Sequence, residues 1–197
     1  MKKIINEPTQ VVDEMLQGLS FMHDDLVERL DGFDVIVRKA EKTGKVGLIS
    51  GGGSGHEPSH AGFVGDGMLS AAICGAVFTS PTPDQILEAI KAADEGAGVF
   101  MVIKNYSGDI MNFEIAQELA EMEGIDVASV VVDDDIAVEN SLYTQGRRGV
   151  AGTILVHKIL GDAARSGKSL SEMKDLADKL VLEIKTIGLA LSGATVP

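Results

Sequence analysis

Residues 98–132 read GVFMVIKNYSGDIMNFEIAQELAEMEGIDVASVVV and predict a strand, a helix and a second strand in succession. The run 98–103 is continuously apolar, as is typical of a strand with both faces covered, and 127–132 returns as another buried strand. Strand, helix and strand of these lengths form a βαβ unit. We therefore expect an α/β fold, a largely parallel sheet flanked by helices, with right-handed crossovers. The helix should bury the apolar residues that recur at helical spacing, which are Met111, Ile115, Ala116, Leu119 and Met122.

The segments before this unit supply three further elements. A first amphipathic helix is indicated by helical spacing of Val12, Met15, Leu16, Leu19 and Met22. Residues 45–49 form an apolar strand that should end at the glycine cluster 51–55, where we expect the backbone to turn sharply. A helix should then begin with Thr82 as N-cap, Pro83 at the first helical position and Gln85 completing a capping box. Its buried stripe would be Ile86, Leu87, Ile90 and Ala93.

After the βαβ unit, two more helices are predicted, one over 154–164 and one opened by the capping box Ser169 to Glu172. The polar stretch 133–148 is expected to be a long loop, in which Arg147 and Arg148 are more often solvated than bound to a ligand. Residues 187–191 have strand character and predict the start of another domain. We therefore expect an N-terminal α/β domain over 1–185 and the truncated beginning of a C-terminal domain over 186–197.

Composition narrows the function classes. The chain has 197 residues, of which 45% are apolar, and 30 acidic against 17 basic residues give a net charge of -13. This charge disfavours binding to nucleic acid and to anionic membranes. The lone Cys74 cannot form an internal disulfide, which favours a reducing compartment. The apolar start of the chain is interrupted by residues 6–9, and no run approaches the length of a membrane span, so a soluble, cytoplasmic protein is expected.

The first candidate site motif is the turn Gly51 to Pro58, which follows a predicted strand. Its glycines leave backbone N–H groups open to a phosphate or to small hydroxyl and carbonyl oxygens. The motif lacks the Lys-Ser/Thr ending of a P-loop and has no usable G-x-G-x-x-G register. His56 can accept or donate a proton near neutral pH. His60 could share a helical face with His56 as a metal pair, but an ordinary packing or hydrogen-bonding role is the better interpretation.

The remaining candidate residues are two further histidines and a second motif. His23 and His157 are expected to be structural and to lack polar partners. At the end of the next strand, Lys104 and Asp109 flank a short polar turn, and both turns should face one pocket, because ligands bind outside the carboxyl ends of parallel strands. Asp109 could act as a base and Lys104 could orient an oxygen or neutralise phosphoryl charge. Asp109 could equally cap the following helix.

Five segments together resemble, in order and spacing, the K-domain of dihydroxyacetone kinases. They are GLISGGGSGHEPSHAGFVGDGMLSAA (47–72), FTSPTPDQI (78–86), IKNYSGDIMNFEIA (103–116), DDDIAVENS (133–141) and YTQGRRGVAGT (143–153). The resemblance covers essentially the whole chain and is closest to the separate substrate-binding subunit of the bacterial phosphotransferase-dependent enzymes.

This resemblance implies that dihydroxyacetone is bound by Gly53, Ser54, His56, Lys104 and Asp109, with His56 and Asp109 assisting proton transfer from the accepting hydroxyl. It implies that the chain itself binds no metal or cofactor, since ADP or ATP and magnesium are held by a partner L subunit, and an M subunit rephosphorylates the ADP. A homodimer is also implied.

One departure affects the activity expected. The family attaches its substrate covalently to a histidine in a glycine-rich motif C-terminal to the matched region, and this sequence does not contain that motif. We therefore expect the chain by itself to bind weakly and to catalyse little or nothing. Two rival functions remain open at this point: a dihydroxyacetone-sensing regulatory co-activator without kinase activity, and a binding module for another small sugar or keto-acid. The presence of both His56 and Asp109 favours the enzyme.

Overall fold

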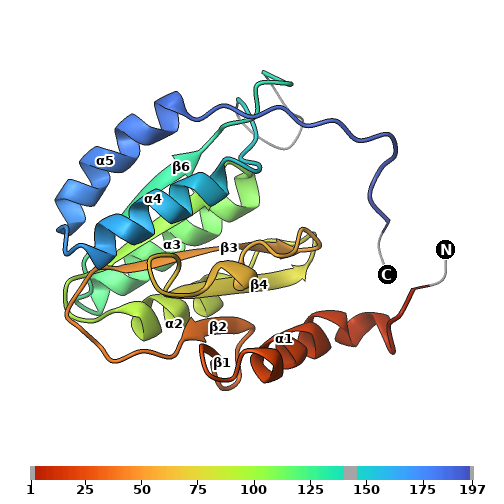
Figure 1. Cartoon of the computed structure of the whole chain (residues 1–197), viewed down its shortest axis with the longest axis horizontal. Helices are drawn as coiled ribbons and strands as arrows, with labels where there is room; N and C mark the ends of the chain where they lie inside the picture. The colour runs from red at the N-terminus through yellow and green to blue at the C-terminus, as the bar shows by residue number, and fades with distance from the viewer. Residues whose placement is uncertain (1–2, 140–145, 196–197) are drawn as a thin grey trace.

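A six-stranded mixed sheet forms the centre of the computed structural model, which describes residues 3–139 and 146–195 (Figure 1). The strand order is β1-β2-β4-β3-β5-β6. The strands are β1 (Val27–Arg29), β2 (Val35–Arg38), β3 (Gly47–Ser54), β4 (Ala71–Val77), β5 (Val99–Lys104) and β6 (Val127–Val132). The α-helices are α1 (Val11–Met22), α2 (Pro83–Ala93), α3 (Ser107–Met122), α4 (Thr153–Arg165) and α5 (Leu170–Glu183).

The parallel part of the sheet confirms the predicted fold class. Strands β4, β3, β5 and β6 pair in parallel, and β5, α3 and β6 are the βαβ unit expected from the sequence. The sequence analysis did not anticipate β1 and β2, which pair antiparallel with each other and join the sheet antiparallel to β4. Strands this short carry little periodic signal, and a hairpin needs no helical crossover to connect them.

Helices cover both faces of the sheet, and the side chains of β5 alternate between the two resulting cores. Phe100 and Val102 pack into the core shared with α1, α4 and α5. Met101 and Ile103 pack into the core shared with α2 and α3. This twofold alternation with both faces buried explains why β5 reads as a continuous apolar run.

The predicted buried face of α3 is wrong in all but one residue. Ala116 is buried, but Met111, Ile115 and Leu119 are exposed and Met122 is 84% exposed. The residues that α3 buries are Asp109, Phe113, Ala116 and Ala120. Both sets have helical spacing, and the small alanines of the second set allow the close approach of neighbouring elements that bulkier side chains would prevent. The prediction based on side-chain hydrophobicity therefore assigned the wrong face of α3 to the core.

The glycine cluster is also placed differently from the prediction. Strand β3 continues through Gly51, Gly52 and Gly53 to Ser54, and the turn begins only at Gly55, whose φ is +124°. A Cβ at Gly51 would lie 2.6 Å from the carbonyl oxygen of Ile73 in β4. These glycines therefore permit close packing within the sheet, and the backbone does not turn there.

The two predicted capping boxes differ in outcome. At α5 the box is confirmed, because Ser169 accepts a hydrogen bond from the Glu172 backbone and the Glu172 carboxylate accepts one from the Ser169 backbone. At α2, Thr82 is the N-cap and Pro83 lies in the first turn, but the Thr82 side chain makes no capping hydrogen bond. The predicted box at α2 is therefore wrong.

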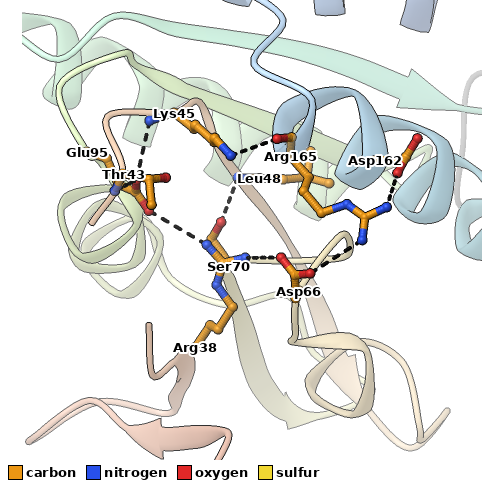
Figure 2. A network of polar contacts seen from close by, with 9 residues as sticks. All are labelled: Arg38, Thr43, Lys45, Leu48, Asp66, Ser70, Glu95, Asp162 and Arg165. Carbon is orange, nitrogen blue, oxygen red and sulfur yellow. Dashed lines mark hydrogen bonds and ion pairs between the residues drawn. The ribbon is translucent and has the colours of Figure 1, made fainter. Parts of the chain in front are cut away.

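Polar contacts connect the segments at the amino ends of β3, β4 and β5 (Figure 2). The Glu95 carboxylate accepts hydrogen bonds from the Thr43 and Lys45 backbones and lies 3.7 Å from the Arg38 guanidinium. Asp66 lies within 4 Å of both Arg38 and Arg165. This network stabilises the end of the sheet formed by the amino ends of these strands. The candidate site lies at the opposite end, at the carboxyl ends of the strands.

Ion pairs join the two described ends of the loop after β6, residues 133–139 and 146–148. Asp134 and Asp135 are buried, Arg148 pairs with Asp135 at 2.7 Å, and Arg147 pairs with Asp133 at 3.0 Å. The expectation that both arginines are merely solvated is therefore wrong. Residues 140–145, which belong to two of the motifs quoted above, lie outside the described residues.

The predicted strand over 187–191 is absent. Thr186 forms one isolated bridge with Asp135, after which Ile187, Leu189 and Leu191 are exposed and make no strand. The division into domains at 185 remains a prediction, and residues 196 and 197 lie outside the described part of the chain. Within residues 3–139 and 146–195, no helix has the length and apolar character needed to cross a membrane.

Candidate functional site

The two predicted turns meet at the carboxyl ends of adjacent parallel strands. Strand β3 leads to His56 and β5 ends at Lys104, and the two strands pair in register from Gly47 opposite Val99 to Ser50 opposite Val102. The Nε2 atom of His56 lies 2.5 Å from the Nζ atom of Lys104. Parallel pairing brings these residues together although they are 48 positions apart in sequence.

Lys104 is an almost fully buried cation, 6% exposed. Burial lowers the pKa of Lys104, and the negative charge of Asp109 partly opposes this shift. Its Nζ lies 5.4 Å from the centre of the Tyr106 ring. A Cβ at Gly52 would lie 2.9 Å from this Nζ, so the absence of a side chain at Gly52 provides the room for the ammonium group. Sequence reasoning noted Gly52 within a cluster but did not assign it this role.

Asp109 lies in the first turn of α3 and is 3% exposed. The Ser80 hydroxyl donates a hydrogen bond to its Oδ1. Burial raises the pKa of Asp109, while the Ser80 hydrogen bond and the Lys104 charge act against this rise. Tyr106 occupies the N-cap position, so Asp109 is not the N-cap of α3. Ser80 was missed by the sequence analysis, because a single serine between strand and helix carries no distinguishing signal.

The hydrogen bonds of His56 define its protonation state. A protonated Lys104 donates to Nε2, which must then carry the lone pair, so the ring proton resides on Nδ1. Partial burial and the Lys104 charge lower the pKa of His56, and Glu57 and a hydrogen bond with the Ser59 backbone oppose this shift. His56 is therefore a neutral imidazole at neutral pH with its basic nitrogen facing Lys104.

Gly53 and Ser54 lie at the end of β3 but are occupied by structural contacts. The Ser54 hydroxyl donates to the carbonyl oxygen of Gly75 at 2.8 Å, which uses its only proton. A Cβ at Gly53 would lie 2.5 Å from the backbone nitrogen of Thr79, so this position is packed against the segment after β4. Of the five predicted site residues, the structure brings His56 and Lys104 into contact and places Asp109 close enough to Lys104 for their charges to interact.

A cavity of about 380 Å³ opens beside Lys104, between the turn that follows β3 and the start of α4. This volume corresponds to roughly ten water molecules, ample for a ligand of three carbons. Its polar lining groups include His56, His60, Lys104, Tyr106 and Thr153.

His60 and His157 contact each other. Their Nδ1 and Nε2 atoms, respectively, lie 2.9 Å apart, which supports a hydrogen-bonding role for His60 and shows that the expected lack of a polar partner for His157 is wrong. The His56 to His60 segment is a turn and not a helix, so the two rings do not share a helical face. Among the described residues, no group of three His, Cys, Asp or Glu side chains is arranged to hold a metal ion.

Comparison with known proteins shows which family the chain resembles. The Dak1 domain model matches residues 17–197. The chain is 71% identical over 196 residues to the dihydroxyacetone-binding subunit of the PTS-dependent dihydroxyacetone kinase of Lactococcus lactis, covering 100% of this chain and 59% of that protein.

Solved structures give the same result. The dihydroxyacetone kinase of C. freundii matches with a TM-score of 0.84 and 40% identity over 90% of this chain and 33% of that one. A dihydroxyacetone kinase operon co-activator matches with a TM-score of 0.79 and 43% identity over 84% of this chain and 51% of that one. This chain thus spans little more than half of the Lactococcus relative and a third of the C. freundii kinase. Because the domain model matches nearly the entire chain, the chain belongs to the Dak1 domain family.

Proposed function

We propose that this chain is the N-terminal part of the dihydroxyacetone-binding subunit of a dihydroxyacetone kinase, which presents dihydroxyacetone for phosphoryl transfer from a nucleotide held by a partner subunit. The observation that carries this proposal is the contact between His56 and the buried Lys104, with the buried Asp109 carboxylate nearby. The high identity to the Lactococcus subunit supports it.

The site offers two acceptors for the proton of the reacting hydroxyl. When that hydroxyl attacks phosphorus, an O–P bond forms, the bond from phosphorus to the nucleotide breaks, and the hydroxyl proton passes to His56 Nε2 or to the Asp109 carboxylate. In the free protein Lys104 occupies His56 Nε2, so the substrate hydroxyl must displace the ammonium from this position. Lys104 is then free to orient a substrate oxygen or to stabilise developing negative charge.

Burial prepares Asp109 for the same role. Because its pKa is raised, Asp109 is a stronger base than an ordinary carboxylate, while Ser80 and Lys104 favour its ionised form at neutral pH. The two bases approach from different elements, the turn after β3 and the first turn of α3. A small polyol in the cavity lined by His56 and Lys104 would be positioned beside a base, and positioning of this kind contributes strongly to phosphoryl transfer.

Partners and cofactors are part of the proposal. We expect an L subunit to supply ADP or ATP with magnesium, an M subunit to rephosphorylate the ADP, and the dihydroxyacetone-binding subunit to be a cytoplasmic homodimer. We also expect residues 1–197 by themselves to show little or no turnover, because the family's covalent histidine belongs to a motif that these residues do not contain.

The test uses the full-length gene product with its L and M partners. Intact-mass spectrometry after incubation with dihydroxyacetone should show a covalent adduct, and a coupled assay should show phosphorylation that is lost in His56→Ala and Asp109→Ala. In Lys104→Met the loss of the cation should raise the pKa of His56, so any residual activity should rise with pH along a limb displaced to higher pH.

The structural similarity to an operon co-activator defines the competing outcome. An adduct without turnover in the presence of both partners would favour a sensing co-activator. Absence of both signals, with tight binding of another small sugar or keto-acid, would assign the site to a different ligand.

A further inference from the structure

Behind the candidate site lies a buried pair of imidazoles. His157 on α4 is fully buried and His60 is 3% exposed. Their rings lie 5.2 Å apart at 70°, with His60 Nδ1 directed at His157 Nε2. The rings of His56 and His60 also form a T-shaped contact, with centroids 5.4 Å apart at 84°. Three rings thus lead from the site into the core.

Among the described residues, no anion interacts with this pair to stabilise a charged form. The groups that face it are Lys104 from β5 and His56 from the turn, and Phe63 approaches the His157 ring at 6.4 Å. Burial lowers the pKa of His157 to about 3 and lowers the pKa of His60 well below its usual value, and Lys104 adds to both effects. Two neutral imidazoles share one hydrogen bond, in which one ring donates and the other accepts.

Either direction of this bond leaves one N–H group and one lone pair at opposite ends of the pair. His60 Nε2 and His157 Nδ1 are indeed buried without a hydrogen-bond partner among the described residues. Unpaired buried polar atoms carry a free-energy cost that apolar side chains at the same two positions would avoid. We therefore interpret the contact between the rings as a specific arrangement and not as generic packing.

The pair connects the turn that carries His56 to helix α4. His56 itself is exposed and lies in a turn without regular secondary structure. Helix α4 is fixed, because Gly161 packs against Gly67 so closely that a Cβ there would lie 2.5 Å from the Gly67 carbonyl oxygen. His60 therefore links the turn that carries His56 to a helix that cannot easily shift.

We propose that His60 and His157 are positioning residues, whose shared hydrogen bond holds the turn after β3 so that the His56 Nε2 atom faces Lys104 and the substrate. This inference rests on the proposed function for its kinetic consequence, but the position of His56 is measurable without substrate. In this proposal neither histidine exchanges a proton with the substrate.

A crossed set of amide substitutions tests the shared bond in the full-length protein. An asparagine amide reaches the place of a histidine Nδ1 and a glutamine amide the place of Nε2. His60→Asn and His157→Gln should therefore keep the bond, whereas His60→Gln and His157→Asn should break it. His23→Gln, at an exposed histidine at the end of α1, is the matched control.

The first measurement is the pKa of His56 by NMR of ring-labelled histidine, from about pH 5 to pH 8. Glu57, Lys104 and His60 are the titratable groups that face His56. When the bond is broken, His56 should move away from Lys104 and its pKa should rise toward the ordinary value. The bond-keeping variants and the His23 control should match the unaltered protein.

The second measurement is kcat/KM for dihydroxyacetone, which should fall about 10- to 100-fold in the bond-breaking variants and by less than about threefold in His157→Gln and in the His23 control. Equal His56 titration in all folded variants would overturn the proposal, as would an equal loss in bond-keeping and bond-breaking variants. If the unaltered protein shows no turnover, the proposed function fails, and the NMR result still decides the positioning role.

Discussion

Replacement of Gly52 by alanine should impair the site with little effect on folding, whereas the same change at Gly51 should do the opposite. The new methyl at position 52 would lie 2.9 Å from Lys104 Nζ and 3.2 Å from Lys104 Cε, both at the end of a flexible side chain. Relief to an ordinary contact requires Nζ to move by at least roughly 0.5 Å, which disrupts its 2.5 Å contact with His56. At position 51 the methyl would meet backbone of β4 at 2.6 Å, which can move only if the pairing of β3 with β4 is disturbed.

The magnitudes follow from these two kinds of contact. Overpacking against backbone costs about 1–3 kcal/mol, so Gly51→Ala should lower Tm by roughly 5 °C. In Gly52→Ala, the side-chain shift is partly offset by about 0.4–1 kcal/mol from the reduced entropy of the unfolded chain, so Tm should change by less than about 3 °C. A misplacement approaching 1 Å at a catalytic group can cost about 100-fold, and kcat/KM should fall by 10- to 100-fold in this variant.

Thermal unfolding followed by circular dichroism and coupled phosphorylation by the full-length protein with its partners would measure both quantities. The reasoning is refuted if Gly52→Ala retains turnover within about threefold. It is also refuted if the two variants lose Tm equally, since the distinction between flexible and backbone contacts would then have no consequence.

Three further outcomes are expected. Asp134 accepts hydrogen bonds from the Val150 and Gly152 backbones, so Asp134→Ala should lower the free energy of unfolding in urea by about 3–5 kcal/mol. The control Asp133→Ala, at a half-exposed neighbour, should lower it by less than about 1 kcal/mol, and similar losses in the two variants would contradict this prediction. Because the pKa of His157 is about 3 in the folded chain, only the unfolded chain gains its proton as pH falls from about 6.5. The free energy of unfolding should therefore fall by about 2 kcal/mol by about pH 5. In His157→Gln, urea titrations at different pH values should lack this part of the dependence of the free energy of unfolding on pH. Phe113→Ala should cost about 3–5 kcal/mol and Met122→Ala almost nothing, whereas the face of α3 predicted from hydrophobicity requires the reverse.

The fold class was predictable because the elements of the βαβ unit, and several of the helices around it, carry local signals. The run 98–103 is apolar throughout since both faces of β5 are buried, and the box from Ser169 to Glu172 marks a helix start through contacts within four residues. The joining of two turns at the carboxyl edge was also predictable, because parallel strands align their ends. The sequence therefore predicts His56, Lys104 and Asp109 as candidate site residues.

Other features depend on neighbours that are distant in sequence. Two helical faces of α3 have equal periodicity, and only packing in the fold selects Phe113 over Met111. The role of Gly52 depends on Lys104 lying across from it, and that of Ser80 on Asp109. His60 and His157 are 97 residues apart, and the local sequence around each gives no signal of their contact. Hydrophobic periodicity and caps act within a few residues and so appear in the sequence, whereas steric room, burial of charge and shared hydrogen bonds exist only once the chain has brought separate segments together.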